Sequence, residues 1–431
     1  MKVYKFGGAS VRSADGVRNL CDIVREETEP LFVVVSAMGK TTNALEGVLE
    51  RFMAGDRDGA LDGFAQVERN HEEILAGLFP EGVPATVAGA VEALYAKARG
   101  VLLSGGAREA DYDRWYDRIV SFGELISTTI VSAYLERAGV PNRWIDMRRC
   151  FVTSTRHRDA NINLPLSAPL LKRAVAGTPV RVFVGQGFIG STAAGDPTTL
   201  GREGSDYSAA VAANILDAES LSIWKDVEGI LNADPKLFAD TVYIPELTYL
   251  DAIELAYSGA QIIHPKTIKP LQNKNIPLYV RPFSDKGKPG SVIRGEMTGR
   301  IEAPILILKP NQVLLSIRPK DFSFVIEDRM VYIFSLLEQY RIRTNLIQSS
   351  AVNLSICVDA SRHLKEVAER LRQEFRVVYN SDMELLTIRG YTPPLYEKYA
   401  ESSNAYLIQK TRKMVRIVRR TFPWRPQTNI Y

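Results

Sequence analysis

Residues 185–210 read GQGFIGSTAAGDPTTLGREGSDYSAA, the most informative stretch of the chain. Its glycines allow the backbone to approach a ligand closely and to offer N–H groups. Ser205 and Asp206 add short polar side chains, and Arg202 adds a planar cation that suits a carboxylate or phosphate. Small residues from Ser208 to Asn214 predict a helix whose N-terminus faces the same ligand. The stretch indicates an anion-binding site, with a glycine-rich surface loop and helix cap as the alternative.

Two other predicted strands are also followed by glycine-rich, polar residues. The chain opens with apolar Val3–Tyr4 and continues as Lys5-Phe6-Gly7-Gly8-Ala9-Ser10. A strand that ends in a Gly-Gly turn before a helix is typical of phosphate binding, with Lys5 as the charge, although Lys5 at a solvated strand end is the alternative. The apolar run Leu31–Ser36 leads into the polar, glycine-bearing residues 37–42. Because ligands of open α/β sheets collect at the carboxyl ends of strands, these loops predict one nucleotide-phosphate site.

Together these segments resemble the aspartate kinases of the amino-acid kinase family. The matching blocks are KFGGAS (5–10), VVVSAMGKTTNAL (33–45), SFGELIS (121–127), GFIGST (187–192), TTLGREGSDYSA (198–209), KDVEGILNADPK (225–236), ELAYSGAQIIHPKTI (254–268) and IPLYVR (276–281). They cover nearly the whole chain in the family's order. The resemblance implies a three-layer α/β/α catalytic domain over residues 1–295, built on a mainly parallel sheet.

Alternation of apolar strands with helical periods supports the same fold class. The predicted strands are Val3–Phe6, Leu31–Ser36, Asn142–Asp146, Val180–Gly185, Ser220–Lys225 and Pro277–Arg281. Residues 44–118 are mostly helical in pattern, with a Pro/Gly interruption at Phe79–Pro84, and in the family such a segment forms a lobe over the substrate. The glycine-rich, charged stretch Ser284–Gly299 is the expected domain boundary.

The C-terminal part has a different pattern. Strands are expected at Val313–Ile317, Leu354–Val358, Glu384–Arg389, Tyr406–Gln409 and Val415–Val418, and helices at Met330–Tyr340, His363–Phe375 and Pro394–Glu401. This order is ferredoxin-like and resembles the ACT regulatory domain, which aspartate kinases carry twice. The first copy is expected over 311–381. A shortened second copy is expected over 382–431, completed by residues 303–310.

Composition sets the class of protein. Apolar residues make up 45% of the 431 residues, enough for a large core in two or more domains. The formal net charge is +4, but Ser402–Tyr431 carries seven Lys or Arg and no acid, so the rest of the chain is slightly acidic and we expect no nucleic-acid partner. Three scattered cysteines, no leader sequence and no long apolar run predict a cytoplasmic protein that does not enter a membrane.

The resemblance implies a reaction and roles for one half of the site. Aspartate kinases transfer the γ-phosphoryl group of ATP, with Mg²⁺, to the β-carboxylate of L-aspartate. By resemblance, Lys5 and Asp206 are catalytic, and Asp206 organises Lys5 or the water shell of Mg²⁺. The residues expected to hold aspartate are Thr42, Glu124, Arg202 and Ser205. A carboxylate at a helix N-terminus is the alternative for Glu124, and an N-cap of the helix from Ser208 is the alternative for Asp206.

The nucleotide half departs from the family's commonest form. The residues expected to bind nucleotide are Lys5, Gly7, Gly8, Ser36, Lys225, Asp226, Leu231, Lys236, Gln261 and Ile262. A lysine is usual at Gln261 and a threonine at Lys225, so we hypothesise that Lys225 takes over the role of the missing cation. His264 is expected to have a packing or loop role. No protein metal site is expected, since Mg²⁺ arrives with ATP.

The ACT-like region implies feedback by an end product, lysine or threonine. The expected effector contacts are Asn345, Ser349 and Ser350 in the stretch NLIQSSAVN (345–353), because this stretch is expected to offer exposed amide and hydroxyl groups. An ordinary solvated hairpin is the alternative. A homodimer or higher oligomer through the ACT domains is expected. Two other classes of function stay open. One is a kinase of another amino acid or small acid. The other is a non-catalytic regulator, either a degenerate kinase body with a working ACT sensor or a nucleic-acid-bound protein that uses the basic tail Lys410–Arg425.

Overall fold

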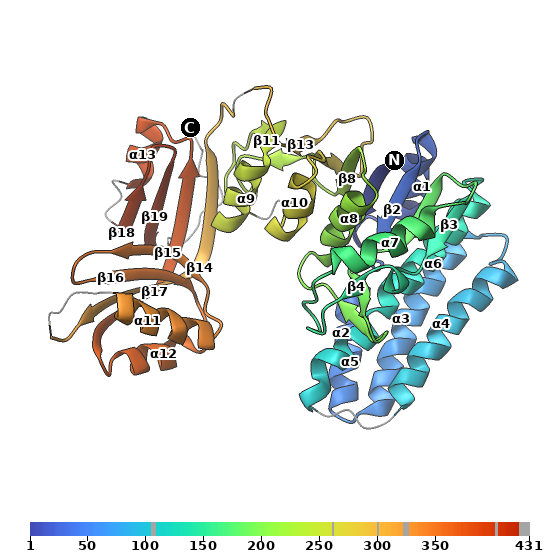
Figure 1. The fold of residues 1–431 in the computed structure, drawn as a ribbon, viewed down its shortest axis with the longest axis horizontal. Coiled ribbons are helices and arrows are strands. Elements are labelled where there is room, and N and C mark those ends of the chain that lie inside the picture. Colours follow the sequence, from blue (N-terminus) through green and yellow to red (C-terminus); the bar gives the residue numbers. More distant parts are fainter. Residues whose placement is uncertain (105–108, 261–262, 300, 322–326, 401–403, 422–431) are drawn as a thin grey trace. The chain divides into compact units, whose positions relative to one another are not determined.

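The chain forms two units of structure (Figure 1). The structure is a computed structural model that describes residues 1–104, 109–260, 263–299, 301–321, 327–400 and 404–421. The first unit contains Met1–Ile230, Pro245–Ala252 and Ile263–Thr298, and the second contains Leu231–Ile244, Ile253–Ile262 and Gly299–Tyr431. The first unit therefore ends inside the glycine-rich stretch Ser284–Gly299. Residues 231–244 and 253–260 belong with the C-terminal part, although the sequence pattern places them in the catalytic domain.

An eight-stranded sheet forms the centre of the first unit. Its order is β11-β13-β12-β8-β1-β2-β5-β3, and all neighbours run parallel except β12 and β13. The strands are β1 (Lys2–Phe6), β2 (Leu31–Val35), β3 (Asn142–Ile145), β5 (Val182–Gln186), β8 (Ser220–Lys225), β11 (Glu246–Thr248), β12 (Leu278–Pro282) and β13 (Ser291–Arg294). All six strands predicted for this unit are confirmed to within two residues at each end.

Helices cover both faces of this sheet. The alternate residues Leu31, Val33 and Val35 belong to one core together with α1 (Ala14–Glu26) and α6 (Phe122–Arg137). The helix α8 (Gly204–Ile215) contacts β1, β2 and β8 and covers the opposite face, flanked by α7 (Leu164–Val175) and α10 (Pro265–Gln272). Because strands between two helical layers are buried on both sides, β2 reads LFVVV without polar alternation. The predicted three-layer α/β/α class is confirmed.

A helical lobe extends from the first unit, as the pattern of residues 44–118 predicted. It consists of α2 (Thr41–Met53), α3 (Arg57–Leu78), α4 (Ala85–Leu103) and α5 (Tyr112–Val120) (Figure 1). The Pro/Gly interruption forms the loop between α3 and α4. The helical stretch Tyr112–Arg137 is long and apolar enough to cross a membrane, but 72% of its most apolar window is buried inside the fold, as in a core helix.

Smaller elements complete this unit and lead into the second. A three-stranded sheet has the order β4-β6-β7, and a two-stranded ladder joins β9 and β10. The bounds are β4 (Val152–Thr153), β6 (Ile189–Thr192), β7 (Pro197–Thr199), β9 (Ile230–Leu231), β10 (Tyr243–Ile244), α9 (Tyr249–Ser258) and the short 3₁₀ helices Glu109–Asp111 and Met147–Arg149.

A six-stranded antiparallel sheet forms the second unit, in the order β15-β16-β14-β17-β19-β18. Its elements are β14 (Ile305–Pro319), α11 (Glu327–Gln339), β15 (Thr344–Ser349), β16 (Leu354–Asp359), α12 (Leu364–Leu371), β17 (Phe375–Arg389), α13 (Pro393–Ala400), β18 (Ala405–Lys410) and β19 (Met414–Arg420). The predicted strands and helices are present. The helix expected over His363–Phe375 ends at Leu371 instead, because Phe375 already begins β17.

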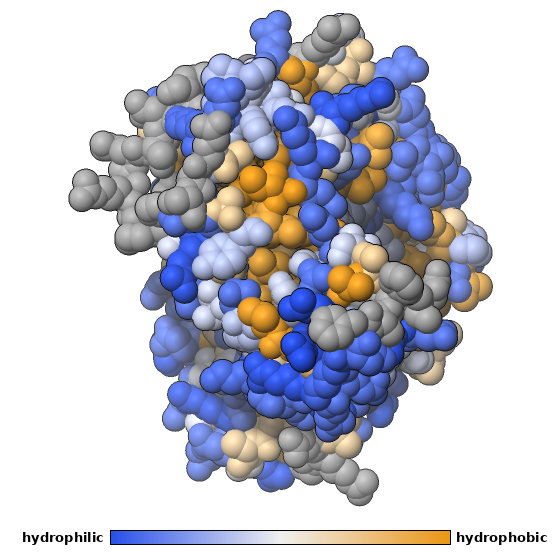
Figure 2. All heavy atoms as spheres, turned by 90° about the vertical axis from the view of Figure 1, so that its left-hand side faces the viewer, coloured by the Kyte–Doolittle hydropathy of each residue, from blue (hydrophilic) through white to orange (hydrophobic). Residues whose placement is uncertain are grey.

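Two long strands join the halves of this sheet. The first half of β14, Ile305–Lys309, pairs with Leu385–Arg389, and its second half pairs with both β16 and the start of β17. The pairing shifts register between Lys309 and Leu314, where Asn311 has a φ of 54°. Each half thus has its own four strands and its own apolar cluster. Figure 2 shows hydrophobic residues reaching the molecular surface among hydrophilic ones. On the second unit, Val331 and Val378 are more than half exposed.

Candidate active site

The predicted loops meet around one cavity of about 370 Å³ in the first unit. Strands β1, β2 and β8 end there, and α8 begins there, so the parallel topology brings distant segments together. The cavity is lined by Lys5, Gly8, Ser36, Ala37, Gly39, Thr42, Glu124, Phe188, Gly201, Glu203, Gly204, Ser205, Asp206 and Lys225. Eight of the residues predicted from the sequence, Gly8 among them, therefore line this cavity.

Two lysines flank a buried carboxylate at this cavity. Lys5 Nζ lies 2.6 Å from Asp206 Oδ1, and Lys225 Nζ lies 3.5 Å from Asp206 Oδ2. Burial alone would raise the pKa of Asp206, but the two ammonium groups outweigh it and hold that pKa below its ordinary value. Asp206 is therefore ionised, and the trio carries a net positive charge. Such a group suits an anion.

Asp206 is held by the first turn of α8 rather than by its cap. The helix begins at Gly204, and the cap position is Glu203, which has a φ of 53° and makes no side-chain capping bond. The alternative of Asp206 as an N-cap is therefore wrong. Its carboxylate sits where the helix dipole stabilises negative charge, which is compatible with its contacts to both lysines.

Glu124 contributes a second buried carboxyl group. It lies in the first turn of α6 and is 2% exposed. The Ala37 N–H donates to Oε1 over 3.3 Å, while Oε2 has no hydrogen-bond partner among the described residues. Burial raises the pKa of Glu124 to about 8, although the Ala37 N–H favours the charged form. A buried acid with one unsatisfied oxygen at a cavity can receive a cation from a ligand.

Close backbone contacts explain two of the glycines. A Cβ on Gly8 would lie 2.6 Å from the Ala37 carbonyl oxygen, and a Cβ on Gly187 would lie 2.5 Å from Ser205 Cβ. The Gly39 N–H donates to the Gly8 carbonyl over 2.9 Å, so the loops after β1 and β2 are tied together. Glycine is required here because the loops approach each other more closely than a side chain permits.

Other predicted site residues lie elsewhere or outside the description. Arg202 is exposed and does not line the cavity, and Asp226 is exposed after β8. Gly7 is next to Lys5, whose Nζ would lie 3.5 Å from a Cβ at Gly7. Leu231 and Lys236 belong to the second unit. Gln261 and Ile262 fall outside the described residues, so their roles remain predictions.

His264 has the loop role that was expected, because its imidazole caps α10 by accepting from the Lys266 N–H. Sequence reasoning missed Phe188 and Glu203 as lining residues. Both have left-handed backbone conformations, with φ of 66° and 53°. Their signal was their place inside the GFIGST and GREGSD blocks, where residues with side chains adopt conformations usually left to glycine.

The expected effector contacts differ in exposure. Asn345 is buried, and its amide is engaged: Nδ2 donates to Gln312 and Asp359, and Oδ1 accepts from Lys309 over 2.8 Å. Ser349 and Ser350 are exposed at the end of β15. The expectation that Asn345 offers an exposed amide is thus wrong, while the two serines do offer hydroxyl groups.

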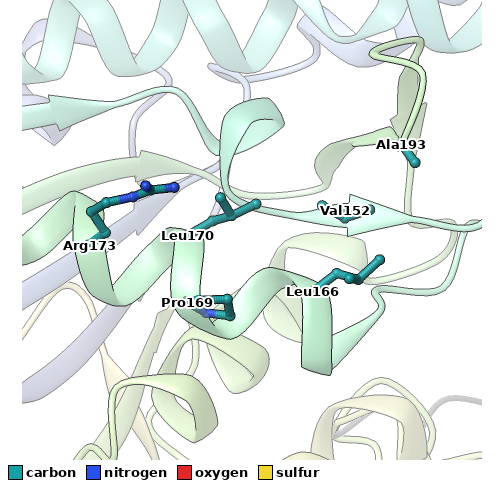
Figure 3. Close-up of a pocket in the computed structure, with 6 residues that line it drawn as sticks. All are labelled: Val152, Leu166, Pro169, Leu170, Arg173 and Ala193. Carbon is teal, nitrogen blue, oxygen red and sulfur yellow. The ribbon is translucent and has the colours of Figure 1, made fainter.

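A larger hollow of about 540 Å³ is lined mainly by apolar residues and lacks the cluster of charged groups found at the first cavity (Figure 3). Leu166, Pro169, Leu170 and Arg173 on α7 face Val152 and Ala193. Its single charged group is Arg173, and no predicted site residue lines it. Around the site and elsewhere in the described part of the chain, no group of three or more His, Cys, Asp or Glu is arranged to hold a metal ion.

Comparison with known proteins agrees with this geometry. The profile of the amino acid kinase family matches residues 1–282. Lysine-sensitive aspartokinase 3 of Escherichia coli is 31% identical over 368 residues, which cover 83% of this chain and 78% of that protein. The maize bifunctional aspartokinase/homoserine dehydrogenase 1 is 31% identical over 297 residues, covering 68% of this chain. The chain spans only about a third of that longer relative, 32% of its length.

Solved structures give the same assignment. E. coli aspartokinase III in complex with aspartate and ADP superposes with a TM-score of 0.79 at 26% identity, covering 97% of this chain and 96% of that one. The aspartate kinase of Clostridium acetobutylicum, at 20% identity and a TM-score of 0.78, shares the fold. Its family profile, its relatives and its fold agree, and the chain belongs to the amino acid kinase family, within it to the aspartokinases.

Proposed function

We propose that this chain phosphorylates the β-carboxylate of L-aspartate with ATP and gives 4-phospho-L-aspartate, the first step towards lysine, threonine and methionine. One observation carries the proposal: a cluster of cations on Asp206 and the buried Glu124 carboxyl line the same cavity. The first suits a phosphoryl group, and the second suits an ammonium group. An amino acid with a side-chain carboxylate, beside a triphosphate, satisfies both.

The acceptor explains why cations dominate the site. A carboxylate nucleophile has a pKa of about 4, so it is already ionised and needs no general base. The enzyme has to align two anions and neutralise the charge of the transferring group. Lys5 and Lys225 supply positive charge on either side of Asp206. The histidine of the matching blocks, His264, is engaged as a helix cap and has no part in this step.

ATP and Mg²⁺ fit the residues that are present. The N–H-rich loops after β1 and β2 would hold the phosphates, with Gly8 and Ser36 at the cavity. Mg²⁺ binds through one or two carboxylates together with phosphate oxygens, and Asp206 would contact its water shell. The metal would neutralise charge on the triphosphate. This chain's part is to hold Lys5 and Lys225 beside it.

Aspartate is assigned to the other side of the cavity. Glu124 pairs with its α-ammonium group, and Thr42 and Ser205 line the space beside it. Arg202 is proposed to hold a carboxylate, by resemblance to the family. It lies between Gly201 and Glu203 at the rim, and its fork geometry suits a planar acid.

Acceptor specificity tests the proposal. ADP release from Mg-ATP is measured with aspartate, glutamate, N-acetylglutamate and UMP as acceptors. Turnover with aspartate well above that with the other three is expected. Preference for another acceptor would reassign the chain within its family, and turnover with none of them would overturn the kinase assignment.

Regulation is proposed for the second unit. We assign it to two ACT-like halves that bind lysine or threonine and support a homodimer or larger assembly. The support is the paired ferredoxin-like order of β14–β19 and the exposed Ser349 and Ser350. Titrating each amino acid against activity, with light scattering for mass, tests it. A monomer indifferent to both would contradict this part of the proposal.

A further inference from the structure

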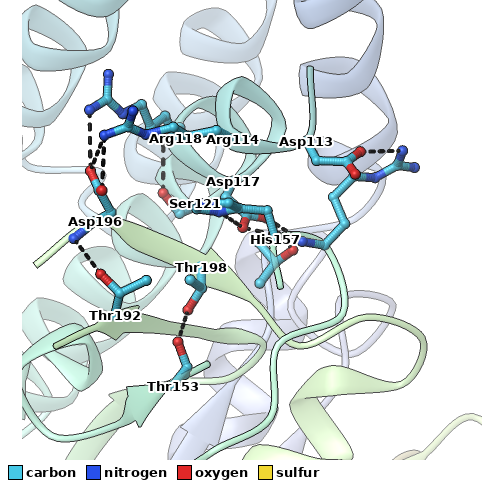
Figure 4. Close-up of polar contacts among 12 residues, drawn as sticks. Asp113, Arg114, Asp117, Arg118, Ser121, Thr153, His157, Thr192, Asp196 and Thr198 are labelled. Atoms are coloured by element: carbon cyan, nitrogen blue, oxygen red, sulfur yellow. Dashed lines mark hydrogen bonds and ion pairs between the residues drawn. The ribbon is translucent and has the colours of Figure 1, made fainter. Parts of the chain in front are cut away.

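A buried carboxylate outside the cavity connects the helical lobe to the loop that follows Thr199. Asp117 on α5 is fully buried. Its Oδ1 accepts from the Thr199 hydroxyl over 2.5 Å, its Oδ2 lies 2.7 Å from His157 Nδ1, and the Arg158 N–H reaches both oxygens at 3.2 Å (Figure 4). These partners are 40 to 82 positions away in sequence. A carboxylate so placed joins three segments of the chain.

One of those segments leads directly into the cavity. Thr199 ends β7 and is followed by Leu200 and Gly201, and Gly201 lines the site with a φ of 76°. A Cβ on Gly201 would lie 2.8 Å from Asp159 Oδ1 and 3.1 Å from the Arg158 carbonyl oxygen. The turn held by Asp117 therefore packs closely against Gly201. Moving this turn would move the loop that carries Arg202 and Glu203.

Another residue that lines the cavity follows Asp117 closely in the chain. The helix α5 ends at Val120, and α6 begins at Phe122, so Glu124 follows Asp117 by seven residues. Asp117 is thus close in the chain to Glu124 and is hydrogen-bonded to Thr199, two residues before Gly201, and both Glu124 and Gly201 line the cavity. The hydrogen bond between the Thr199 hydroxyl and Asp117 is buried away from water, where the loss of one partner costs considerable free energy.

A second contact between the same elements provides a comparison. Arg114 and Arg118, on α5, pair with Asp196 near the other end of β7, at 2.9 and 3.3 Å (Figure 4). These side chains are partly exposed, between 30% and 46%. Ion pairs at such positions contribute little because water and salt screen them. They hold the hairpin turn, which does not line the cavity.

We propose that Asp117 is a positioning residue for the acidic substrate: through Thr199 and the 157–159 turn it sets the spacing between Glu124 and the Gly201–Glu203 loop. The inference rests on the proposed function, because it assigns the acceptor to these two parts of the cavity lining. The hydrogen bonds of Asp117 go to His157, Arg158 and Thr199, and none of those that the structure describes goes to the loops after β1 and β2. Weakening these bonds should therefore affect the acceptor more than ATP.

Kinetics on the full chain test this assignment. Thr199→Val removes the hydroxyl but keeps the shape, and Thr199→Ser keeps the hydroxyl. We expect Thr199→Val and Asp117→Asn each to raise KM for aspartate about tenfold or more, with KM for ATP within about twofold of wild type. Thr199→Ser restores the wild-type value, and Asp196→Asn leaves both constants unchanged.

Three results would overturn the inference. The first is an unchanged KM for aspartate in Thr199→Val, and the second is an equal rise in the KM values for aspartate and ATP. The third is a KM for aspartate in Thr199→Ser that stays above the wild-type value. If Asp117→Asn does not fold, the two Thr199 variants decide. Wild-type turnover is measured first; should it fail with aspartate, the proposed function fails, and the same KM ratio is measured with the acid that wild type does accept.

Discussion

The raised pKa of Glu124 should make aspartate binding depend on pH, because Glu124 is proposed to receive the ammonium group of aspartate. At pH 7 a group with a pKa of about 8 is roughly one-tenth ionised, so the free site mostly holds a neutral carboxyl. The ammonium group of aspartate favours the carboxylate form. Binding at pH 7 therefore releases a proton, and affinity strengthens as pH rises towards 8 and levels off above it.

The magnitude follows from the same pKa. Ionising Glu124 at pH 7 costs about 1.4 kcal/mol of binding free energy, since the pKa lies one unit above the pH. The apparent KM for aspartate should fall roughly 25-fold between pH 6.5 and 8.5, most steeply below pH 8. KM for ATP should show no such dependence on pH, because Glu124 is proposed to contact the acceptor and not the nucleotide.

Steady-state kinetics at saturating Mg-ATP measure this slope, and calorimetry in two buffers of different ionisation enthalpy counts the released proton. Glu124→Gln should bind aspartate weakly, and its KM for aspartate should not change with pH in this range. Glu46→Gln is the control, because Glu46 accepts from the Tyr116 hydroxyl and does not line the cavity. A flat profile in wild type, or the same slope in Glu124→Gln, would refute the assignment of Glu124.

Three further predictions concern charge, close packing and stability. Lys225→Ala should raise KM for ATP much more than KM for aspartate, measured by initial rates, and unchanged values for both would make Lys225 a surface lysine. Gly187→Ala forces a Cβ to 2.5 Å from Ser205 and should reduce kcat/KM at least tenfold while the far-ultraviolet circular dichroism is retained; full activity would show that the loop can yield. Arg419→Ala leaves the fully buried Glu384 without its 2.7 Å partner and should cost about 3–5 kcal/mol of unfolding free energy in urea, so a change below about 1 kcal/mol would contradict that pairing.

The strands of the first unit were predictable because a strand that is buried on both faces has a mostly apolar sequence. Leu31–Val35 and Ser220–Lys225 are found within one residue of the expected bounds. The meeting of their loops followed from parallel topology, in which carboxyl ends share one edge. Motif blocks added Glu124, which no local pattern would single out.

What could not be predicted depends on contacts between distant segments. The first half of β17 reads FRVVYNSDM, whose polar residues hide a strand that pairing with β14 stabilises. Asp117 looks like an ordinary helical acid until its partners at 157 and 199 are in place. The amide of Asn345 is not exposed as expected, because Lys309, from another strand, donates to its side-chain oxygen.

Trapping the product tests the central claim most directly. With Mg-ATP, aspartate and hydroxylamine, the account predicts aspartyl β-hydroxamate, identified by mass spectrometry, and almost none from Lys5→Met. Its absence in wild type, an α-hydroxamate in its place, or full yield from Lys5→Met would contradict the claim that Lys5, Asp206 and Glu124 bring the β-carboxylate against the γ-phosphoryl group.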